Sequence, residues 1–117
     1  MTGPLADLAV DWAGGVALVA VNGEIDLSNG ASLERRLRTE CAPATAVVLD
    51  LSGVAYMDSA GLALVDGLAR DLAGRGAGLR LVAPPGSAPQ RVIALAGLDV
   101  PLDPTRDAAV AGLAPDA

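Results

Sequence analysis

The sequence predicts an α/β domain built on a mixed sheet of about five strands, with about four α-helices. Short apolar runs with the length of strands alternate with segments of helical periodicity along most of the chain. The first two runs, 8–12 and 16–21, are joined by Gly14-Gly15, which supply the positive backbone angles of a hairpin turn. We therefore expect an antiparallel first pair of strands, followed by parallel strands joined by helical connections.

The later elements are placed by breaks and caps. The run Ala46–Leu51 is almost continuously apolar, as expected of a central strand covered on both faces. Further strands are expected at 79–82 and 100–102. Helices are expected from Ser28 or Asn29 to about Glu40, from about Ala60 to Leu72 with Leu62, Val65, Ala69 and Leu72 on the inner stripe, from a cap at Ser87 to Gly97, and from a cap at Thr105 to about Leu113.

The chain is expected to fold as one domain over residues 1–117, with an ordered core over about 8–113. A chain of 117 residues is long enough to bury one core. Residues 1–7 include Gly3 and Pro4 and are expected to fray, and the tail from Ala114 onward is expected to be loose.

Hydrophobic residues make up 52% of the chain, yet the longest apolar run, Val16–Val21, is far shorter than the ~20 residues of a membrane-spanning helix. The amino terminus lacks the basic-then-apolar pattern of a secretory signal. We therefore expect a cytoplasmic location without direct membrane insertion. The single cysteine, Cys41, can form no internal disulfide and is expected to serve in packing.

The missing residue types exclude several classes of function. The chain has no histidine, and all 8 of its basic residues are arginine. This removes the usual general base, the commonest metal ligand and the lysine of phosphate-binding loops. A net charge of −6, with Trp12 and Tyr56 as the only aromatic residues, argues against binding of nucleic acid. We therefore expect a binding module rather than an enzyme, with no cofactor of its own.

The most informative segment is Asp58-Ser59-Ala60-Gly61, which lies between the expected central strand and the following helix. Asp58 and Ser59 are short polar residues of the kind that cap helix starts, and Gly61 in the first turn leaves room for another backbone to approach. A hydroxyl at this position is exposed at the positive end of a helix dipole. Ser59 can therefore be a helix cap alone or, in addition, an acceptor of a phosphoryl group.

Phosphorylation of Ser59 would add a charge of about −1.5 to −2 to a neutral surface. The helix amides are expected to help hold the phosphate oxygens, so that the fold changes little. Glu24 and Asp26 would add to the negative charge of Asp58 if their two loops meet. These three carboxylates could also bind a cation, but without further oxygen ligands at regular spacing a solvated acidic rim is favoured, and we expect no metal site.

The segment Tyr56-Met57-Asp58-Ser59-Ala60-Gly61-Leu62 closely resembles the phosphorylation loop of anti-sigma factor antagonists with a STAS domain. The segment Gly23-Glu24-Ile25-Asp26 resembles a second recurring element of that family, which lies beside the phosphorylation loop. The resemblance extends from about Leu8 to Leu113 and implies the STAS fold. It also implies that Ser59 is the phosphorylated residue and that the partner-binding residues are Glu24, Asp26, Asp58, Ser59, Gly61 and Leu62.

The resemblance further implies a partner-switching cycle. In that family the unphosphorylated domain binds an anti-sigma factor, a serine kinase with a histidine-kinase-like ATPase fold, and a sigma factor is thereby released. The kinase then phosphorylates the domain and the complex breaks, until a PP2C-type phosphatase removes the phosphate. Ala60 stands where many relatives carry a second serine or threonine, which leaves a single acceptor in this motif.

A second resemblance keeps another function open. The segment 58–64 is also similar to the small STAS subunits of lipid-transport ATP-binding cassette complexes. In those complexes the same surface docks on an ATPase subunit, and phosphorylation need not matter. An anti-sigma factor antagonist is the leading hypothesis, and a transporter subunit is the alternative.

Overall fold

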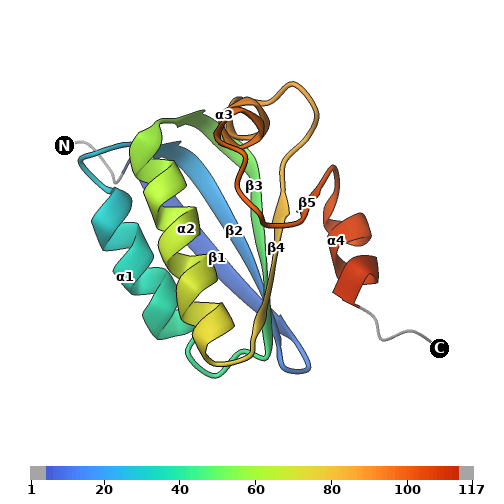
Figure 1. The fold of residues 1–117 in the computed structure, drawn as a ribbon. Helices are drawn as coiled ribbons and strands as arrows, with labels where there is room; N and C mark the ends of the chain where they lie inside the picture. The colour runs from blue at the N-terminus through green and yellow to red at the C-terminus, as the bar shows by residue number, and fades with distance from the viewer. Residues whose placement is uncertain (1–4, 114–117) are drawn as a thin grey trace.

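The computed structural model describes residues 5–113, which form a five-stranded sheet and four helices (Figure 1). The strands lie in the sheet in chain order, the first antiparallel to the second and all others parallel, as predicted. The strands are β1 (Ala6–Ala13), β2 (Val16–Ile25), β3 (Ala46–Met57), β4 (Gly78–Val82) and β5 (Leu102–Asp103). The helices are α1 (Gly30–Glu40), α2 (Ser59–Gly74), α3 (Ala88–Ala96) and α4 (Arg106–Leu113).

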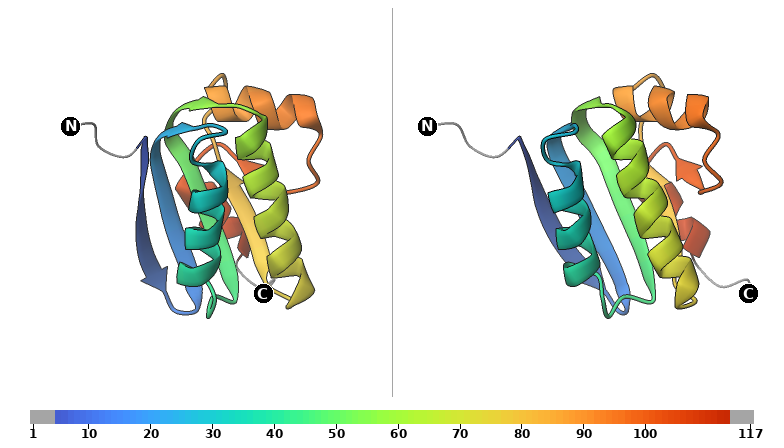
Figure 2. Two further views of the ribbon diagram at one scale, coloured as in Figure 1. Left: turned by 90° about the vertical axis from the view of Figure 1, so that its left-hand side faces the viewer. Right: turned by 60° about the vertical axis from the view of Figure 1, so that its left-hand side comes forward.

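The main core lies between one face of the sheet and the layer formed by α1 and α2 (Figure 2). Alternate residues of β2 point into this core, because successive side chains of a strand face opposite sides of a sheet. Val19 of β2, Leu49 of β3 and Leu68 of α2 are each fully buried there. Full burial of such a side chain contributes about 1.5–3 kcal/mol. Among residues 5–113 no polar or charged residue is buried, so this core is held by apolar packing.

The opposite face of the sheet is covered by α4. Ala109 of α4 packs with Val48 of β3 and Val82 of β4 in a small second core. At the start of the helix, Arg106 Nη2 lies 3.2 Å from Asp50 Oδ2 on β3. Since consecutive residues of β3 are buried from 46 to 49, the prediction of a central strand covered on both faces is confirmed.

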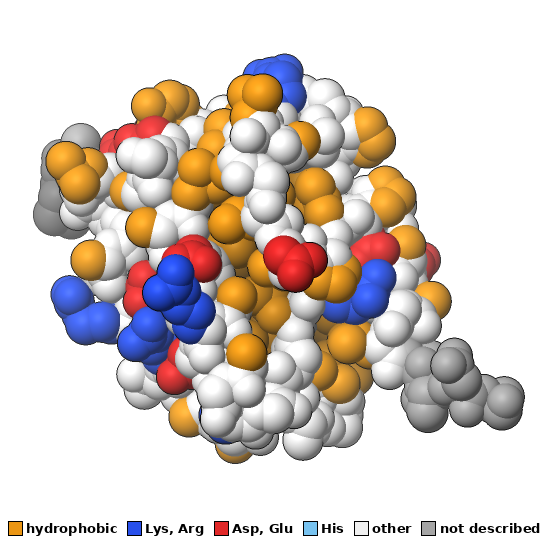
Figure 3. Space-filling model, in the orientation of Figure 1, with side chains coloured by type: hydrophobic (Ala, Val, Ile, Leu, Met, Phe, Trp, Pro, Cys, Tyr) orange, Lys and Arg blue, Asp and Glu red, His pale blue; other side chains and the backbone are white. Residues whose placement is uncertain are grey.

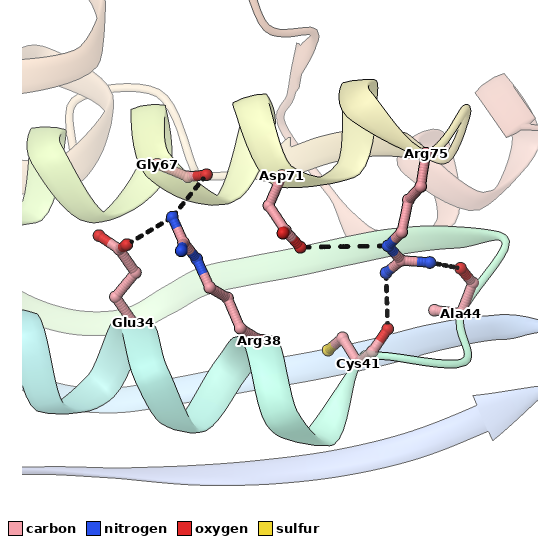
Figure 4. Close-up of polar contacts among 7 residues, drawn as sticks. All are labelled: Glu34, Arg38, Cys41, Ala44, Gly67, Asp71 and Arg75. Atoms are coloured by element: carbon pink, nitrogen blue, oxygen red, sulfur yellow. Dashed lines mark hydrogen bonds and ion pairs between the residues drawn. The ribbon is translucent and has the colours of Figure 1, made fainter.

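Two arginines join α1 and its following loop to α2 (Figure 4). Arg38 lies 2.8 Å from Glu34 on its own helix and donates a hydrogen bond of 3.2 Å to the carbonyl of Gly67 on α2. Arg75, at the end of α2, donates to the carbonyls of Cys41 (2.8 Å) and Ala44 (2.6 Å) in the loop that leads to β3. These contacts hold α1 and α2 side by side, at Gly67 in the middle of α2 and at Arg75 at its carboxyl-terminal end.

The predicted hairpin between β1 and β2 is confirmed, but of its two glycines only Gly14 has a positive φ, of 61°, so the expected positive angle at Gly15 was wrong. The predicted caps in the second half of the chain are confirmed. Ser87 Oγ accepts a hydrogen bond of 3.3 Å from the N–H of Gln90, and Thr105 Oγ1 accepts one of 3.1 Å from that of Ala108. Gly97 ends α3 with a φ of 64°, in the left-handed region that favours glycine. Cys41 is buried as predicted, and burial raises the pKa of its thiol.

Several predicted boundaries were wrong. The ordered part begins earlier than residue 8, because Ala6 is already buried in β1. The last strand is Leu102–Asp103 rather than 100–102. The buried stripe of α2 is Gly61, Leu64, Val65, Leu68 and Leu72, so Leu62 and Ala69 lie at its margin and are only partly buried. The expectations for residues 1–4 and 114–117 lie outside the described residues.

The strands β2 and β3 both run further than predicted, to Ile25 and Met57. Their pairing contains two register shifts, between Ala20 and Asn22 and between Gly23 and Glu24, and each shift accommodates an extra residue in β3. Such bulges interrupt the two-residue alternation of a strand. The buried residues of the second half of β3 are therefore spaced by three, at 51, 54 and 57, a pattern that does not indicate a strand in sequence.

None of the helices within residues 5–113 has both the length and the apolar character needed to cross a membrane.

The two carbonyl contacts of Arg75 predict a stability effect. Replacing Arg75 by methionine should lower the free energy of unfolding by about 1–2 kcal/mol, because the carbonyl of Ala44 loses a charged donor. Arg70→Met is the matched control, since Arg70 is 80% exposed and pairs with Asp66 on the same helix. We expect it to change stability by less than about 0.5 kcal/mol. Urea unfolding followed by circular dichroism measures both, and equal losses would contradict the assignment.

Candidate functional site

The carboxyl ends of β2 and β3 bring two polar loops together. Ile25 pairs with Met57 at the end of the parallel ladder, and the N–H of Asp58 donates a hydrogen bond of 3.3 Å to the carbonyl of Ile25. Since parallel strands end at the same edge of a sheet, the loop between β2 and α1 lies beside the start of α2. The two loops therefore meet, as the sequence-based hypothesis for Glu24, Asp26 and Asp58 requires.

The loop between β2 and α1 is closed by its own side chains. Asp26 Oδ1 accepts hydrogen bonds from the N–H (2.8 Å) and the hydroxyl (2.5 Å) of Ser28. Asn29 occupies the cap position of α1, but its side chain makes no capping hydrogen bond, so the predicted side-chain cap by Ser28 or Asn29 was wrong. The amide of Asn29 reaches back instead, accepting from the N–H of Asp26 (2.9 Å) and donating to the carbonyl of Glu24 (2.8 Å).

These contacts lower the pKa of the Asp26 carboxyl. The hydrogen bond from the Ser28 hydroxyl, followed by the one from the Ser28 N–H, lowers the pKa of the Asp26 carboxyl below its ordinary value of 3.8. Hydrogen bonds to the ionised form favour that form. Asp26 therefore carries its negative charge throughout the neutral range.

The cap of α2 is Asp58, so the predicted capping role of Ser59 was wrong, and its role as a phosphoryl acceptor stays a prediction. Asp58 is the cap of α2, and its Oδ1 accepts a hydrogen bond of 2.8 Å from the N–H of Ala60. Ser59 is the first residue of the helix, and its side chain is exposed. The N–H groups of Gly61 and Leu62 bond to the carbonyl of Asp58 at 3.0 and 3.3 Å. The amides of residues 60–62, which were expected to help hold a phosphate, are thus already occupied.

Gly61 and Leu62 lie beneath this surface rather than on it. Gly61 is buried, and a Cβ at this position would collide with the side chain of Met57, so the expected close approach of another backbone at Gly61 was wrong. A close approach occurs one residue earlier, where a Cβ on Gly30 would lie 3.1 Å from the Cβ of Ala60. Leu62 is partly buried against the main core. The partner-binding roles of Gly61 and Leu62 stay predictions.

A wide, open pocket of about 600 Å³ lies over the two loops. Two exposed apolar side chains, Leu27 (88% exposed) and Tyr56 (49%), border it. Figure 3 shows acidic and apolar side chains side by side near the start of α2, and the largest group of basic side chains in that view lies lower on the same side. Among the described residues no arginine lines the pocket, so its field is negative. The lining residues are Glu24, Asp26, Leu27, Ser28, Tyr56 and Asp58.

Leu27 and Tyr56 were not among the predicted site residues. Leu27 is a single apolar residue between Asp26 and Ser28, a pattern that is ordinary for a surface loop. Tyr56 lies in the apolar segment 54–57, and nothing in the sequence marks it as exposed. Their exposure together at one pocket results from the pairing of β2 with β3. Within residues 5–113 no group of three or more cysteine, aspartate or glutamate side chains is placed to hold a metal ion.

The contacts of Asp26 predict the effect of Ser28→Ala. Loss of the hydroxyl should raise the pKa of Asp26 toward 3.8, because that hydrogen bond is the largest cause of the lowering. Because folding lowers the pKa of Asp26, its ionised carboxylate stabilises the fold at pH values above the ordinary pKa of 3.8. This contribution to stability is lost as the pH falls through the pKa of Asp26 in the folded protein. NMR titration of the Asp26 carboxyl in both proteins measures the shift, and identical midpoints would refute it.

The burial of Gly61 predicts that Gly61→Ala destabilises the fold. The added methyl group must displace the buried Met57 side chain, which should lower the free energy of unfolding by about 1–3 kcal/mol. Gly74→Ala, at the other end of the same helix, is the matched control because a Cβ there meets no atom within 4 Å. Alanine favours helix, so the control should be neutral or stabilising by up to about 1 kcal/mol. Thermal melts of both variants distinguish packing from helix propensity.

Comparison with known proteins identifies the family. The family model described as "Mlab, STAS domain" matches residues 8–104. The anti-sigma-F factor antagonist RsfB of Mycobacterium tuberculosis is 38% identical over 86 residues, which cover 73% of this chain and 69% of RsfB.

Solved structures share the fold. The crystal structure of an anti-sigma factor antagonist from Mycobacterium paratuberculosis has a TM-score of 0.85 at 35% identity, and the match covers 97% of this chain and 98% of that one. The structure of SpoIIAA from Bacillus in its phosphorylated form has a TM-score of 0.70 at 20% identity, over 92% of this chain and all of the other. The predicted five-stranded, four-helix fold is thereby confirmed, and the chain belongs to the STAS domain family.

Proposed function

We propose that this chain is an anti-sigma factor antagonist whose binding is controlled by phosphorylation of Ser59. In this proposal the unmodified chain binds an anti-sigma factor that is a serine kinase, and a sigma factor is released. Transfer of the γ-phosphoryl group of ATP to Ser59 Oγ breaks the complex, and a PP2C-type phosphatase restores the hydroxyl. The names of two relatives, RsfB and the antagonist of Mycobacterium paratuberculosis, support the antagonist role.

The observation that carries the proposal is the position of Ser59. Its side chain is exposed at the first residue of α2, directly after Asp58, which borders the acidic pocket. An enzyme can therefore reach the hydroxyl without unfolding any element. Because Ser59 takes no part in either core, addition of a phosphate leaves the packing of the sheet and helices intact.

The effect of phosphorylation follows from the charges already present. A phosphate of about −1.5 to −2 would join the carboxylates of Glu24, Asp26 and Asp58. A partner shaped for the neutral hydroxyl of Ser59 offers no group at that position that could pair with a phosphate. Desolvation of an additional unpaired dianion costs on the order of 3 kcal/mol, which is roughly a hundredfold in affinity.

The occupied amides make the charge effect stronger. If the N–H groups of residues 60–62 were free, the first turn of α2 could neutralise part of the phosphate charge. They are bonded to the side chain and the carbonyl of Asp58, so the phosphate oxygens remain turned to solvent and to the partner. The chain itself supplies a hydroxyl and a binding surface, while the kinase supplies nucleotide and metal. The partner surface comprises Glu24, Asp26, Leu27, Tyr56, Asp58 and Ser59, with Gly61 and Leu62 supporting it.

Substitution of Ser59 by alanine tests the proposal. Ser59→Ala should bind the kinase as tightly as the wild type and should resist release by ATP. With the kinase recovered by pull-down and radiolabelled ATP, label should enter the wild type and be absent from Ser59→Ala. Ser52→Ala is the control, because Ser52 is an exposed hydroxyl of β3 away from the pocket. It should be labelled like the wild type.

Two outcomes would overturn this function. Equal labelling of the wild type and Ser59→Ala would place the modification elsewhere. Recovery of a transporter ATPase and a permease, with no kinase, would favour the alternative of a lipid-transport STAS subunit.

A further inference from the structure

The end of β2 leaves two backbone groups that require a partner. In an extended strand the carbonyl of one residue and the N–H two residues later point to the same side, where a neighbouring strand normally bonds both. The N–H of Glu24 still bonds to the carbonyl of Leu5, at 3.0 Å. The next two groups, the carbonyl of Glu24 and the N–H of Asp26, both bond to the side chain of Asn29.

Asparagine is suited to this task by its chemistry. Its amide presents one acceptor oxygen and a donor NH₂ group a fixed distance apart, which matches a carbonyl and an N–H along one edge of a strand. Serine offers a single oxygen, and aspartate can accept but not donate. The distances of 2.8 and 2.9 Å are those of well-formed hydrogen bonds. Asn29 therefore replaces a strand for one step of the ladder.

Asn29 also links this loop to the helix that carries Ser59. The next residue, Gly30, is buried against Ala60, and a Cβ on Gly30 would make a tight contact of 3.1 Å with the Cβ of Ala60. The loop is thus attached at one end to the edge of β2 and at the other to the first turn of α2. Asn29 itself does not line the acidic pocket, whereas Glu24 and Asp26, whose backbone it holds, both do.

We propose that Asn29 is a positioning residue that holds Glu24 and Asp26 in the arrangement the partner recognises. This inference rests on the proposed function, because it concerns the same surface. Without the amide, the backbone of residues 24–28 gains freedom that the partner must remove on binding, and such preorganisation is a large part of affinity. Asn29 acts through its neighbours, so phosphorylation chemistry at Ser59 is unaffected once the complex has formed.

The experiment compares Asn29→Ala with Asn22→Ala, which alters the only other asparagine of the chain, an exposed residue of β2. The rate of phosphorylation by the purified kinase and ATP is measured as a function of the concentration of the wild type and of each variant. We expect KM for Asn29→Ala to rise by about tenfold, with kcat within about twofold of the wild type. Asn22→Ala should match the wild type in both constants. Loss of kcat alone, or an unchanged KM, would overturn the inference.

A second measurement requires no partner. Hydrogen exchange at the Asp26 N–H should be about tenfold faster in Asn29→Ala, because that amide loses its acceptor. Unchanged exchange would overturn the inference whether or not the proposed function holds. If no recovered kinase phosphorylates the wild type, the proposed function is refuted. The exchange rate of the Asp26 N–H still tests whether Asn29 holds the loop.

A third variant covers the possibility that Asn29→Ala does not fold, as judged by circular dichroism. Asn29→Asp keeps the acceptor for the Asp26 N–H and loses the donor to the Glu24 carbonyl. It should show an intermediate rise in KM with normal exchange at Asp26. A wild-type KM in this folded variant would count against the positioning role.

Discussion

The site depends on the parallel pairing of β2 with β3. Both strands end at the same edge of the sheet, and the hydrogen bond from Asp58 N–H to the carbonyl of Ile25 ties the two exits together. The bulges in β3 let that strand run two residues further than its partner over the same distance. Without this extra length the turn at Asp58 would not lie level with Asp26, and the acidic pocket between them would not form.

The distribution of arginines explains why the pocket remains negative. Six arginines pair with acidic residues elsewhere in residues 5–113, on α1, on α2 and between the sheet and the carboxyl-terminal elements. None of these pairs includes Glu24, Asp26 or Asp58. Within the described residues the carboxylates of Glu24, Asp26 and Asp58 therefore form no ion pair, and their negative charge is not compensated by an arginine. Exposed ion pairs contribute little to stability, whereas an uncompensated patch acts strongly on association.

The sequence was sufficient to predict the architecture and the meeting of the two loops that carry Glu24, Asp26 and Asp58. The function of these residues stays a prediction. The Gly14-Gly15 turn, the caps at Ser87 and Thr105 and the apolar run at 46–51 are local signals, and local physics decides them. The second half of β3 could not be predicted, because bulges change the spacing of its buried residues from two to three. The contacts of Asn29 could not be predicted either. An asparagine at this position can cap the following helix or bond to the edge of the preceding strand, and the sequence does not distinguish the two. Leu27 and Tyr56 became site residues through tertiary pairing alone.

The internal bonding of the two loops decides how a modification at Ser59 can act. A conformational switch needs groups that can exchange one partner for another. Here Asp58 is engaged by the first turn of α2, Asp26 by Ser28, and the backbone of residues 24–26 by Asn29. These groups already have hydrogen-bond partners, and the core within residues 5–113 contains no buried polar residue. We therefore expect an added charge at Ser59 to cause little conformational change in the domain. In the proposed function, a phosphate at Ser59 would therefore act through its charge at the place where it is added, and the internally bonded loops would hold the neighbouring carboxylates in position.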